Sequence, residues 1–351
     1  MNPKELTYKM PAEWESHERT FLSWPVRESM CYPDEYARVC SGYAEFVKAI
    51  SEFESVSVLV NPDDQKIVRS YLSKPMKHPI EIIAVPHNDS WIRDNGPTFI
   101  KDQQGRLAGV NWRFNAWGEK YEPWDLDDAV APVILSAMQI PCFDAPLVME
   151  GGSFHVDGEG TLLTTEQCLL NPNRNPTMNR EQIEEYLKMY INVEKVIWLK
   201  NGLSGDETDG HVDNIACFAA PGKVLIQSCE DSDDENAEIT QENIRRLENS
   251  IDARGRKLEI IRIPQPPIRF ERDTRLTLSY LNFYFVNQGI ILPIFGGDAE
   301  ETDKQALSIL KDLFPNRTIR TVDGMAIIRE GGNVHCSTQQ MPIIEKKEDS
   351  A

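Results

Sequence analysis

EGGSFHV, residues 150–156, and EGGNVHC, residues 330–336, are two copies of one pattern, E-G-G-[S/N]-x-H-x, about half the chain apart. A motif that recurs at such a distance is typical of an array of repeated supersecondary units. The repeat therefore predicts that the two copies occupy equivalent strand positions in different units. The last position is Val156 in one copy and Cys336 in the other. Because the backbone evidently does not require cysteine there, the repeat favours a special role for Cys336.

Short apolar runs rich in β-branched residues alternate with helical patterns along the rest of the chain, which predicts an α/β fold. The predicted strands cover residues 55–60, 80–85, 160–165, 195–199, 223–227, 289–293 and 324–329, and the predicted helices cover 34–53, 177–190, 239–254 and 303–313. The acidic run 230–235 is expected to be a solvated loop leading into a helix. Neither kind of Gly-rich phosphate-binding fingerprint is found.

Composition limits the partners of the 351-residue chain. Its formal net charge of −19 repels nucleic acid phosphates and anionic lipid, so we expect neither nucleic acid nor membrane as a partner. The same charge fits either solubility or attraction of a small cation. The seven cysteines are scattered and never spaced C-x-x-C, which favours a reduced, cytoplasmic setting over a disulfide framework or a structural zinc site. No signal-peptide layout or membrane-length apolar run is found.

Cys336 has three interpretations: a small buried hydrophobe, a metal ligand or a nucleophile. Gly331 and Gly332 precede it closely and would let backbone or substrate approach. A thiol nucleophile needs a base or another activating group. If the segment is extended, His335 and Cys336 project to opposite faces, so we expect His335 to be a packing or hydrogen-bonding residue.

The stretch GDETDGHVDN, residues 205–214, holds a better partner for the thiol. His211 and Asp213 are two positions apart and would share one face of a strand. Two other interpretations stay open, namely an acidic loop that caps a strand and a pair of metal ligands completed by His155 or His87.

NDSWIRDNGP, residues 88–97, places Asp94 at a tight turn beside an aromatic residue, Trp91. A carboxylate and an aromatic wall together suit a planar cation, since the acid bonds its N–H groups and the ring accepts its face. Alternatively, Asp94 caps its own backbone and Trp91 packs inward.

Glu150 ends the apolar run 145–149 and is followed by two glycines, so it is at risk of burial. A buried carboxylate needs a partner, and either a cationic ligand or the imidazolium of His211 would serve. The alternative is an exposed glutamate at the end of a strand.

Taken together, the motifs MPAEWESHERTFLSWP, NDSWIRDNGP, FNAWGEKY, MEGGSFHVDGEGTLLTTEQCLLNPNRNP, GDETDGHVDN and GGNVHCSTQQMP resemble those of the agmatine deiminases, in matching order from residue 8 to 342. This family is a branch of the guanidino-group-modifying enzymes. The resemblance implies the pentein fold, a pseudo-fivefold α/β propeller of repeated ββαβ units around a central active site. It also implies one catalytic domain over residues 1–351, with the first few residues and 343–351 as peripheral tails.

The resemblance further implies a role for each site residue. Cys336 would be the nucleophile, His211 the general acid and base, and Glu150 a further catalytic carboxylate. Asp94 and Asp213 would bind the guanidinium, and Glu207 and Trp91 would contact the substrate. No metal and no organic cofactor are implied. The chain has Glu119 and Glu330 where relatives commonly have glycine, which we expect to affect only the rim of the pocket.

The expected reaction is hydrolysis of agmatine to N-carbamoylputrescine and ammonia through an amidino-cysteine intermediate. We expect the flanking carboxylates to raise the pKa of the free thiol, so that Cys336 becomes thiolate chiefly in the substrate complex. The alternatives are a deiminase of free or peptidyl arginine, an amidinotransferase and a guanidine- or polyamine-binding protein without turnover. The acidic motifs favour an amine-tailed substrate. Homo-oligomerisation is left open.

Overall fold

The computed structural model describes residues 1–27, 35–328 and 331–344, and its main feature is five small sheets built on one plan. In each sheet two strands pair antiparallel, and a third strand pairs parallel to the second. Parallel neighbours cannot be joined by a tight turn, so a helix forms the crossover in every unit.

The units follow one another around the molecule. The first contains β18 (Gln339–Pro342), β1 (His17–Ser23), α2 (Tyr36–Ser51) and β2 (Ser55–Val60), extended by α3 (Gln65–Tyr71) and β3 (Ile80–Ala84). The second contains β4 (Thr98–Lys101), β5 (Leu107–Arg113), α7 (Val130–Ala137) and β6 (Cys142–Val148), and the third β7 (Phe154–Val156), β8 (Thr161–Thr165), α9 (Arg180–Tyr190) and β9 (Lys195–Leu199). The fourth contains β10 (Ala216–Ala220), β11 (Lys223–Ser228), α10 (Glu235–Glu248) and β12 (Glu259–Pro264), and the fifth β15 (Tyr284–Val286), β16 (Gly289–Ile294), α11 (Glu300–Leu313) and β17 (Thr318–Asp323).

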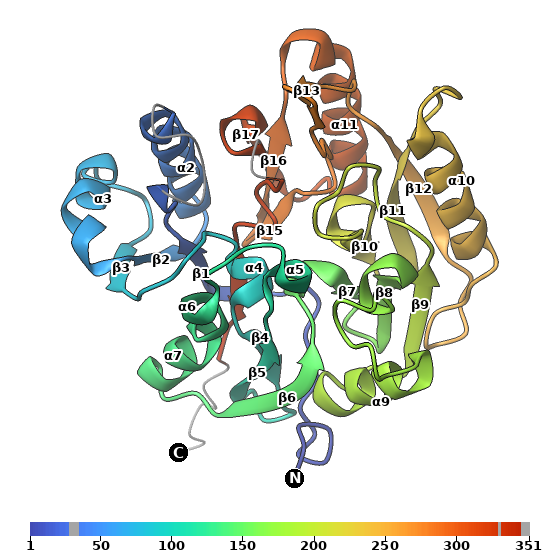
Figure 1. Cartoon of the computed structure of the whole chain (residues 1–351), viewed down its shortest axis with the longest axis horizontal. Helices are drawn as coiled ribbons and strands as arrows, with labels where there is room; N and C mark the ends of the chain where they lie inside the picture. Colours follow the sequence, from blue (N-terminus) through green and yellow to red (C-terminus); the bar gives the residue numbers. More distant parts are fainter. Residues whose placement is uncertain (28–34, 329–330, 345–351) are drawn as a thin grey trace.

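Figure 1 shows β4, β7, β10 and β15 toward the middle of the molecule and the crossover helices at its periphery. The ring closes through the first sheet, where β18, near the end of the chain, pairs with β1 and brings Gln340 opposite Thr20. The predicted pentein arrangement of ββαβ units is confirmed. None of the helices in the described ranges is long and apolar enough to cross a membrane.

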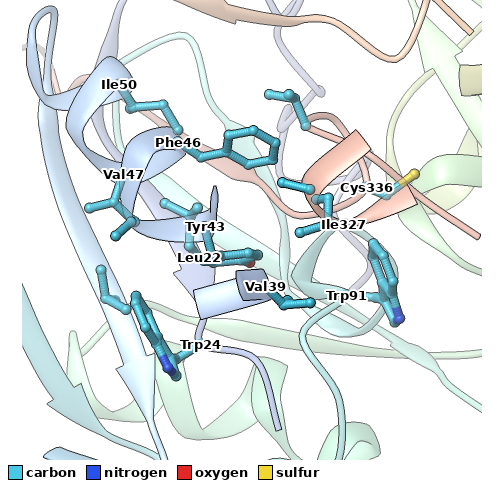
Figure 2. Close-up of a cluster of buried hydrophobic side chains, with 14 of the residues drawn as sticks. Leu22, Trp24, Val39, Tyr43, Phe46, Val47, Ile50, Trp91, Ile327 and Cys336 are labelled. Atoms are coloured by element: carbon cyan, nitrogen blue, oxygen red, sulfur yellow. The ribbon is translucent and has the colours of Figure 1, made fainter. Parts of the chain in front are cut away.

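Each crossover helix is held by an apolar stripe. In α2, buried Tyr43, Phe46, Val47 and Ile50 recur at the helical period and pack in one cluster with Leu22 of β1 (Figure 2). Burying side chains of this size contributes about 1.5–3 kcal/mol each. The helices thus close the outer faces of the sheets and leave the middle of the ring to polar groups.

Most predicted elements are confirmed, apart from their ends. Six of the seven predicted strands correspond to β2, β3, β8, β9, β11 and β16, and three of the four predicted helices to α2, α9 and α11. The predicted helix 239–254 is displaced, because Asp234 caps α10 by accepting a hydrogen bond from Asn236 N and the helix begins at Glu235. The predicted solvated acidic loop is confirmed for residues 230–233, which are exposed, whereas Asp234 is buried and paired with Arg275.

The predicted strand 324–329 is wrong. Residues Gly324–Ala326 form a 3-10 turn that Asp323 caps at Met325 N, while the parallel strand is Thr318–Asp323. That strand is half-exposed and lacks an apolar run, which is why it escaped notice. Arg329, Glu330 and the predicted tail from residue 345 lie outside the described residues. At the other end Met1 is exposed, whereas Lys4 N already donates a hydrogen bond to Met189 O.

Candidate active site

The polar centre is assembled from the short segments that precede the first strand of each unit. α4 (Ile92–Asn95) precedes β4, Glu150 and a 3-10 turn (Gly151–Ser153) precede β7, and a second 3-10 turn (Val212–Asn214) precedes β10. Asn282 precedes β15, and the turn holding Cys336 precedes β18. The two E-G-G strings are therefore topologically equivalent, as the repeat predicted. They differ locally, since Phe154 already begins a strand whereas Cys336 lies in a turn.

A cavity of about 500 Å³, its mouth included, opens onto this centre. The rings of Trp91, Trp117 and Tyr121 line it together with the carboxylates Asp89, Asp94 and Glu207, and with Cys336. Glu150, His211 and Asp213 lie behind this lining and are buried. All seven residues that the sequence singled out are thus brought together in one place.

Cys336 stands at the edge of the apolar cluster, and Figure 2 shows its sulfur pointing away from that cluster beside Trp91. Its Sγ is 3.4 Å from Asp213 Oδ2, and Asn282 Nδ2 donates to it at 3.0 Å. Burial, followed by the charges of Asp213 and Asp94, raises the pKa of the thiol well above its ordinary value. The site without substrate therefore holds a neutral thiol that an incoming cation would acidify.

Asp213 uses its two carboxylate oxygens differently. Oδ2 accepts from His335 Nδ1 at 2.9 Å and is the oxygen beside Cys336. Oδ1 is buried and has no hydrogen-bond partner among the described residues. A buried acceptor without a donor is costly, so this oxygen suits the N–H group of a ligand.

Two local expectations about these residues are wrong. His211 and Asp213 do not lie on a strand, because residues 212–214 form a 3-10 turn, yet both side chains still reach the centre. His335 and Cys336 are not on opposite faces of an extended segment either. Their turn lets both approach Asp213 Oδ2. The expectation that His335 is a hydrogen-bonding residue and not the base for the thiol agrees with this geometry.

Asp94 is held by two fixed donors. Gly152 N donates to Oδ1 and Trp117 Nε1 donates to Oδ2, both at 2.9 Å. Burial, with the nearby charges of Asp213 and Glu150, raises its pKa to about 6 even though His211 and Trp117 lower it. Trp117 is placed by a left-handed turn, since residues 116–119 all have positive φ. Glu119 in that turn is exposed and does not line the cavity.

The pKa of Asp94 sets an expected pH dependence. Below about pH 6 the carboxyl takes up a proton and no longer attracts a guanidinium, so kcat/KM should fall as the pH drops through about 6. Initial rates between pH 5 and 9 with a guanidino substrate measure this limb. A kcat/KM that stays constant from pH 9 down to pH 5 would contradict the expectation.

His211 is fully buried, and neither ring nitrogen has a hydrogen-bond partner among the described residues. Nδ1 is 3.7 Å from Asp94 Oδ1, and Nε2 is 3.6 Å from Glu150 Oε2. Burial alone would lower the pKa of the imidazole, but Asp94, together with Cys168 and Glu150, raises it well above its ordinary value. His211 is therefore held as an imidazolium that can give a proton to a leaving group.

Glu150 is paired mainly with a residue that the sequence reasoning missed. Arg174 Nε donates to Glu150 Oε1 at 2.6 Å, and the same guanidinium binds Asp209 Oδ2 and the carbonyl oxygens of Trp117 and Thr208. His211 was predicted as a partner and lies farther away. The sequence did hold a sign of Arg174, because the residue lies in NPNRNP, the end of one of the motifs that carry the family resemblance.

Within the described ranges, ligand atoms of Glu150, Cys168 and His211 lie within 4.8 Å of one another, close enough for a metal. Two features oppose a cation there. Arg174 already occupies one oxygen of Glu150, and the imidazolium form of His211 has no free lone pair. The absence of a metal from the reaction stays a prediction.

Arg174→Ala should destabilise the fold strongly, because Glu150 would remain buried without its cation. We expect the free energy of unfolding to fall by about 3–5 kcal/mol, measured by urea denaturation. Arg256→Ala is the matched control, since Arg256 also pairs with two carboxylates but is 42% exposed. Its loss should lower the free energy of unfolding far less, because solvent screens an exposed guanidinium. An equal decrease in the free energy of unfolding in the two variants would show that burial of the ion pair does not determine its contribution to stability.

Asn282 is a second residue that the sequence reasoning missed. Besides donating to the thiol, its Oδ1 accepts from the backbone N of His335 at 2.9 Å and of Cys336 at 3.3 Å. It thus fixes the turn that carries the sulfur. Only the repeat hinted at it, since Asn282 precedes the first strand of the fifth unit as the other site residues do in theirs.

Comparisons with known proteins agree with this arrangement. Residues 9–342 match the model of the Porphyromonas-type peptidyl-arginine deiminases. The chain is 46% identical over 340 residues to a putative agmatine deiminase of Legionella pneumophila (strain Paris), covering 97% of each, and 42% identical over 363 residues to the agmatine deiminase of Stutzerimonas stutzeri (strain A1501), again covering 97% of each. The solved structure of the agmatine deiminase of Enterococcus faecalis superposes with a TM-score of 0.89 at 37% identity, over 97% of both chains. Similarity of this extent shows that the chain belongs to the agmatine deiminases, within the Porphyromonas-type peptidyl-arginine deiminase family.

Proposed function

We propose that this protein hydrolyses agmatine to N-carbamoylputrescine and ammonia. The observation that carries the proposal is a narrow cavity with carboxylates both at the thiol and at its mouth. Asp94 lines the cavity beside Cys336, and Asp89 and Glu207 line the same cavity. Agmatine is a dication with a guanidinium at one end and an ammonium at the other, so a cavity lined by three carboxylates suits both ends. Several relatives are named as agmatine deiminases.

Binding would orient the planar cation against the thiol. The guanidinium N–H groups would donate to Asp94 and to Asp213 Oδ1, the buried oxygen that lacks a partner among the described residues. The ring of Trp91 would pack against the face of the cation. Orientation of this kind converts a difficult bimolecular attack into an intramolecular one. The positive charge beside Cys336 would lower the pKa of the thiol, so that its proton passes to solvent and the thiolate remains.

The first half-reaction forms a carbon–sulfur bond and breaks a carbon–nitrogen bond. The thiolate of Cys336 adds to the guanidinium carbon and gives a tetrahedral adduct. The imidazolium of His211 then donates its proton to the departing amino group, which leaves as ammonia. The product is a positively charged amidino-thioester on Cys336, and His211 is left neutral.

Water completes the second half-reaction. Neutral His211 takes a proton from the attacking water, whose oxygen bonds to the amidino carbon. Collapse of this adduct breaks the carbon–sulfur bond, the hydroxyl proton of the adduct passes to the departing sulfur, and the ureido product leaves with Cys336 again a thiol. Glu150, 3.6 Å from Nε2, would keep the imidazole oriented through both steps and stabilise its protonated form.

The pocket disfavours free arginine as the substrate. Arginine carries a carboxylate in addition to its amine, and that group would meet Asp89 and Glu207 at the mouth. Among the described residues, no arginine or lysine lines the cavity. The nearby Lys120 already pairs with Asp209 Oδ1 at 2.8 Å and donates to the backbone oxygen of Glu207.

Substrate competition tests the proposed function. Purified protein would be offered agmatine, arginine, an arginyl peptide and guanidino-amines with shorter or longer chains, and ammonia and the ureido product would be measured. We expect agmatine to have a kcat/KM at least about 100-fold above that of arginine, the size expected when like charges are brought together on binding. Preference for arginine would overturn the substrate, and binding without ammonia would indicate a binding protein.

A further inference from the structure

A chain of buried ionic contacts runs from Asp213 away from the cavity to the N-terminal segment. His335 Nδ1 is 2.9 Å from Asp213 Oδ2, and its Nε2 is 2.8 Å from Glu13 Oε2. All three side chains are at most 4% exposed. Glu13 belongs to the motif MPAEWESHERTFLSWP, which resembled the family without yielding any site residue.

The two contacts favour a charged bridging ring, because both carboxyl groups are ionised. A neutral imidazole has a single N–H, so it could donate to only one of the two carboxylates and would turn a lone pair toward the other at less than 3 Å. An imidazolium donates to both. His335 is therefore best described as an imidazolium between two carboxylates.

Glu13 is itself held in place from several sides. Its Oε1 accepts from Phe285 N of β15 at 3.2 Å, and Oε2 is 3.8 Å from both Arg93 Nη2 and His155 Nε2. The titratable or charged groups that face it from the elements packed around it are Arg93, His155, Cys217, Tyr284, Arg317 and His335. Burial raises the pKa of Glu13, but His335, Arg93 and His155 outweigh it, so the net pKa is low. Glu13 is an anion fixed in a rigid cage.

We propose that Glu13 is a positioning residue for this site: it holds His335 as an imidazolium, and His335 fixes Asp213 with Oδ2 at the thiol and Oδ1 toward the substrate. The proposal rests on the proposed function. Glu13 touches neither substrate nor sulfur and reaches Asp213 through His335. Without it, His335 would lose the anion that keeps it doubly protonated, and Asp213 would be free to rotate.

Arg93, whose Nη2 faces Glu13, also holds the same turn through three hydrogen bonds that do not involve Glu13. Its backbone N donates to Cys336 O at 3.2 Å, Nε to His335 O at 3.3 Å and Nη1 to Gln340 Oε1 at 2.8 Å. The turn should therefore survive the loss of Glu13. A loss of activity in a Glu13 variant would therefore report the position of Asp213 and not unfolding of the turn that holds Cys336.

Glu13→Gln tests the proposal in the full-length protein. Glutamine keeps the shape but not the charge, and a lost charge-assisted hydrogen bond should lower kcat/KM for agmatine about 10- to 100-fold, with a higher KM and a lower kcat. Nitrogen-15 NMR of histidine-labelled protein, with His335 assigned from its disappearance in His335→Gln, should show an imidazolium at pH 8 in the wild type and a neutral ring in Glu13→Gln.

Glu54→Gln is the matched control, because Glu54 also pairs with a buried histidine, His17, at 3.1 Å but does not contact the cavity. It should lower the melting temperature without changing the signals of His335 or kcat/KM. A neutral His335 in the wild type at pH 8, or a folded Glu13→Gln with kcat/KM within about twofold of the wild type, would overturn the proposal.

Two further measurements distinguish failure of the positioning proposal from failure of the proposed function. If Glu13→Gln does not fold, His335→Gln replaces it, and wild-type kcat/KM in that variant overturns the proposal. If the wild-type protein itself releases no ammonia from agmatine, the proposed function fails instead. The charge of His335 is then still decided by NMR.

Discussion

Cys336→Ala is expected to reduce ammonia release from agmatine to background, a loss of at least about 10⁴-fold in kcat, because no other group can form the covalent adduct. Cys336 is the only cysteine that lines the cavity among the described residues. The substrate should still bind, since Asp94 and Asp213 are untouched. Coupled ammonia detection measures the first effect, and the rise in melting temperature with added agmatine measures the second.

Cys40→Ala provides the control for this variant. Cys40 is buried in the same apolar cluster as Cys336 but lies on α2, away from the cavity. The Cys40→Ala variant should have a lower melting temperature and an unchanged kcat for agmatine. Residual catalysis by Cys336→Ala above background would exclude a covalent mechanism through this thiol.

His211→Gln is expected to have the second largest effect, a loss of about 10²–10⁴-fold in kcat, because both half-reactions route a proton through this ring. Glutamine approximates the size of imidazole but cannot carry the proton. KM should change less, since His211 lies behind the cavity lining and does not bind the guanidinium in the proposed pose. Steady-state kinetics with agmatine separates the two parameters.

His17→Gln is the comparison that isolates proton transfer. His17 is also a buried histidine paired with a carboxylate, Glu54, and it does not line the cavity. We expect it to cost stability but to retain kcat within a fewfold. A His211→Gln enzyme with near wild-type kcat would show that another group carries the proton.

The fold could be predicted largely because its elements are encoded locally. β2 and β9 appear in the sequence as short runs rich in valine, isoleucine and leucine, and their predicted bounds agree with the structure. α9 begins at Arg180, three residues after the predicted start at residue 177. Its start is set by a capping box between Asn179 and Gln182, which the apolar pattern does not show. The half-exposed β17 could not be found, since polar residues separate Ile319 from Val322 and leave no continuous apolar run.

The candidate site was predictable in part for a different reason. Cys336, His211, Asp94 and Glu150 each lie in a short string of unusual composition, and a resemblance to known motifs joined those strings. Partners that act over long sequence separations were missed. Glu13 meets His335 across 322 positions, and Asn282 meets Cys336 across 54, so nothing near either residue indicates its role.

The most direct test of the account is to trap the covalent intermediate. Wild-type protein mixed with agmatine would be quenched in acid within the first turnovers, digested and analysed by mass spectrometry. The account predicts that the peptide containing Cys336 gains the mass of agmatine less ammonia, and that the gain disappears when the substrate is exhausted. Steady turnover with the Cys336 peptide unmodified at every quench time, or with the added mass on another cysteine, would contradict it.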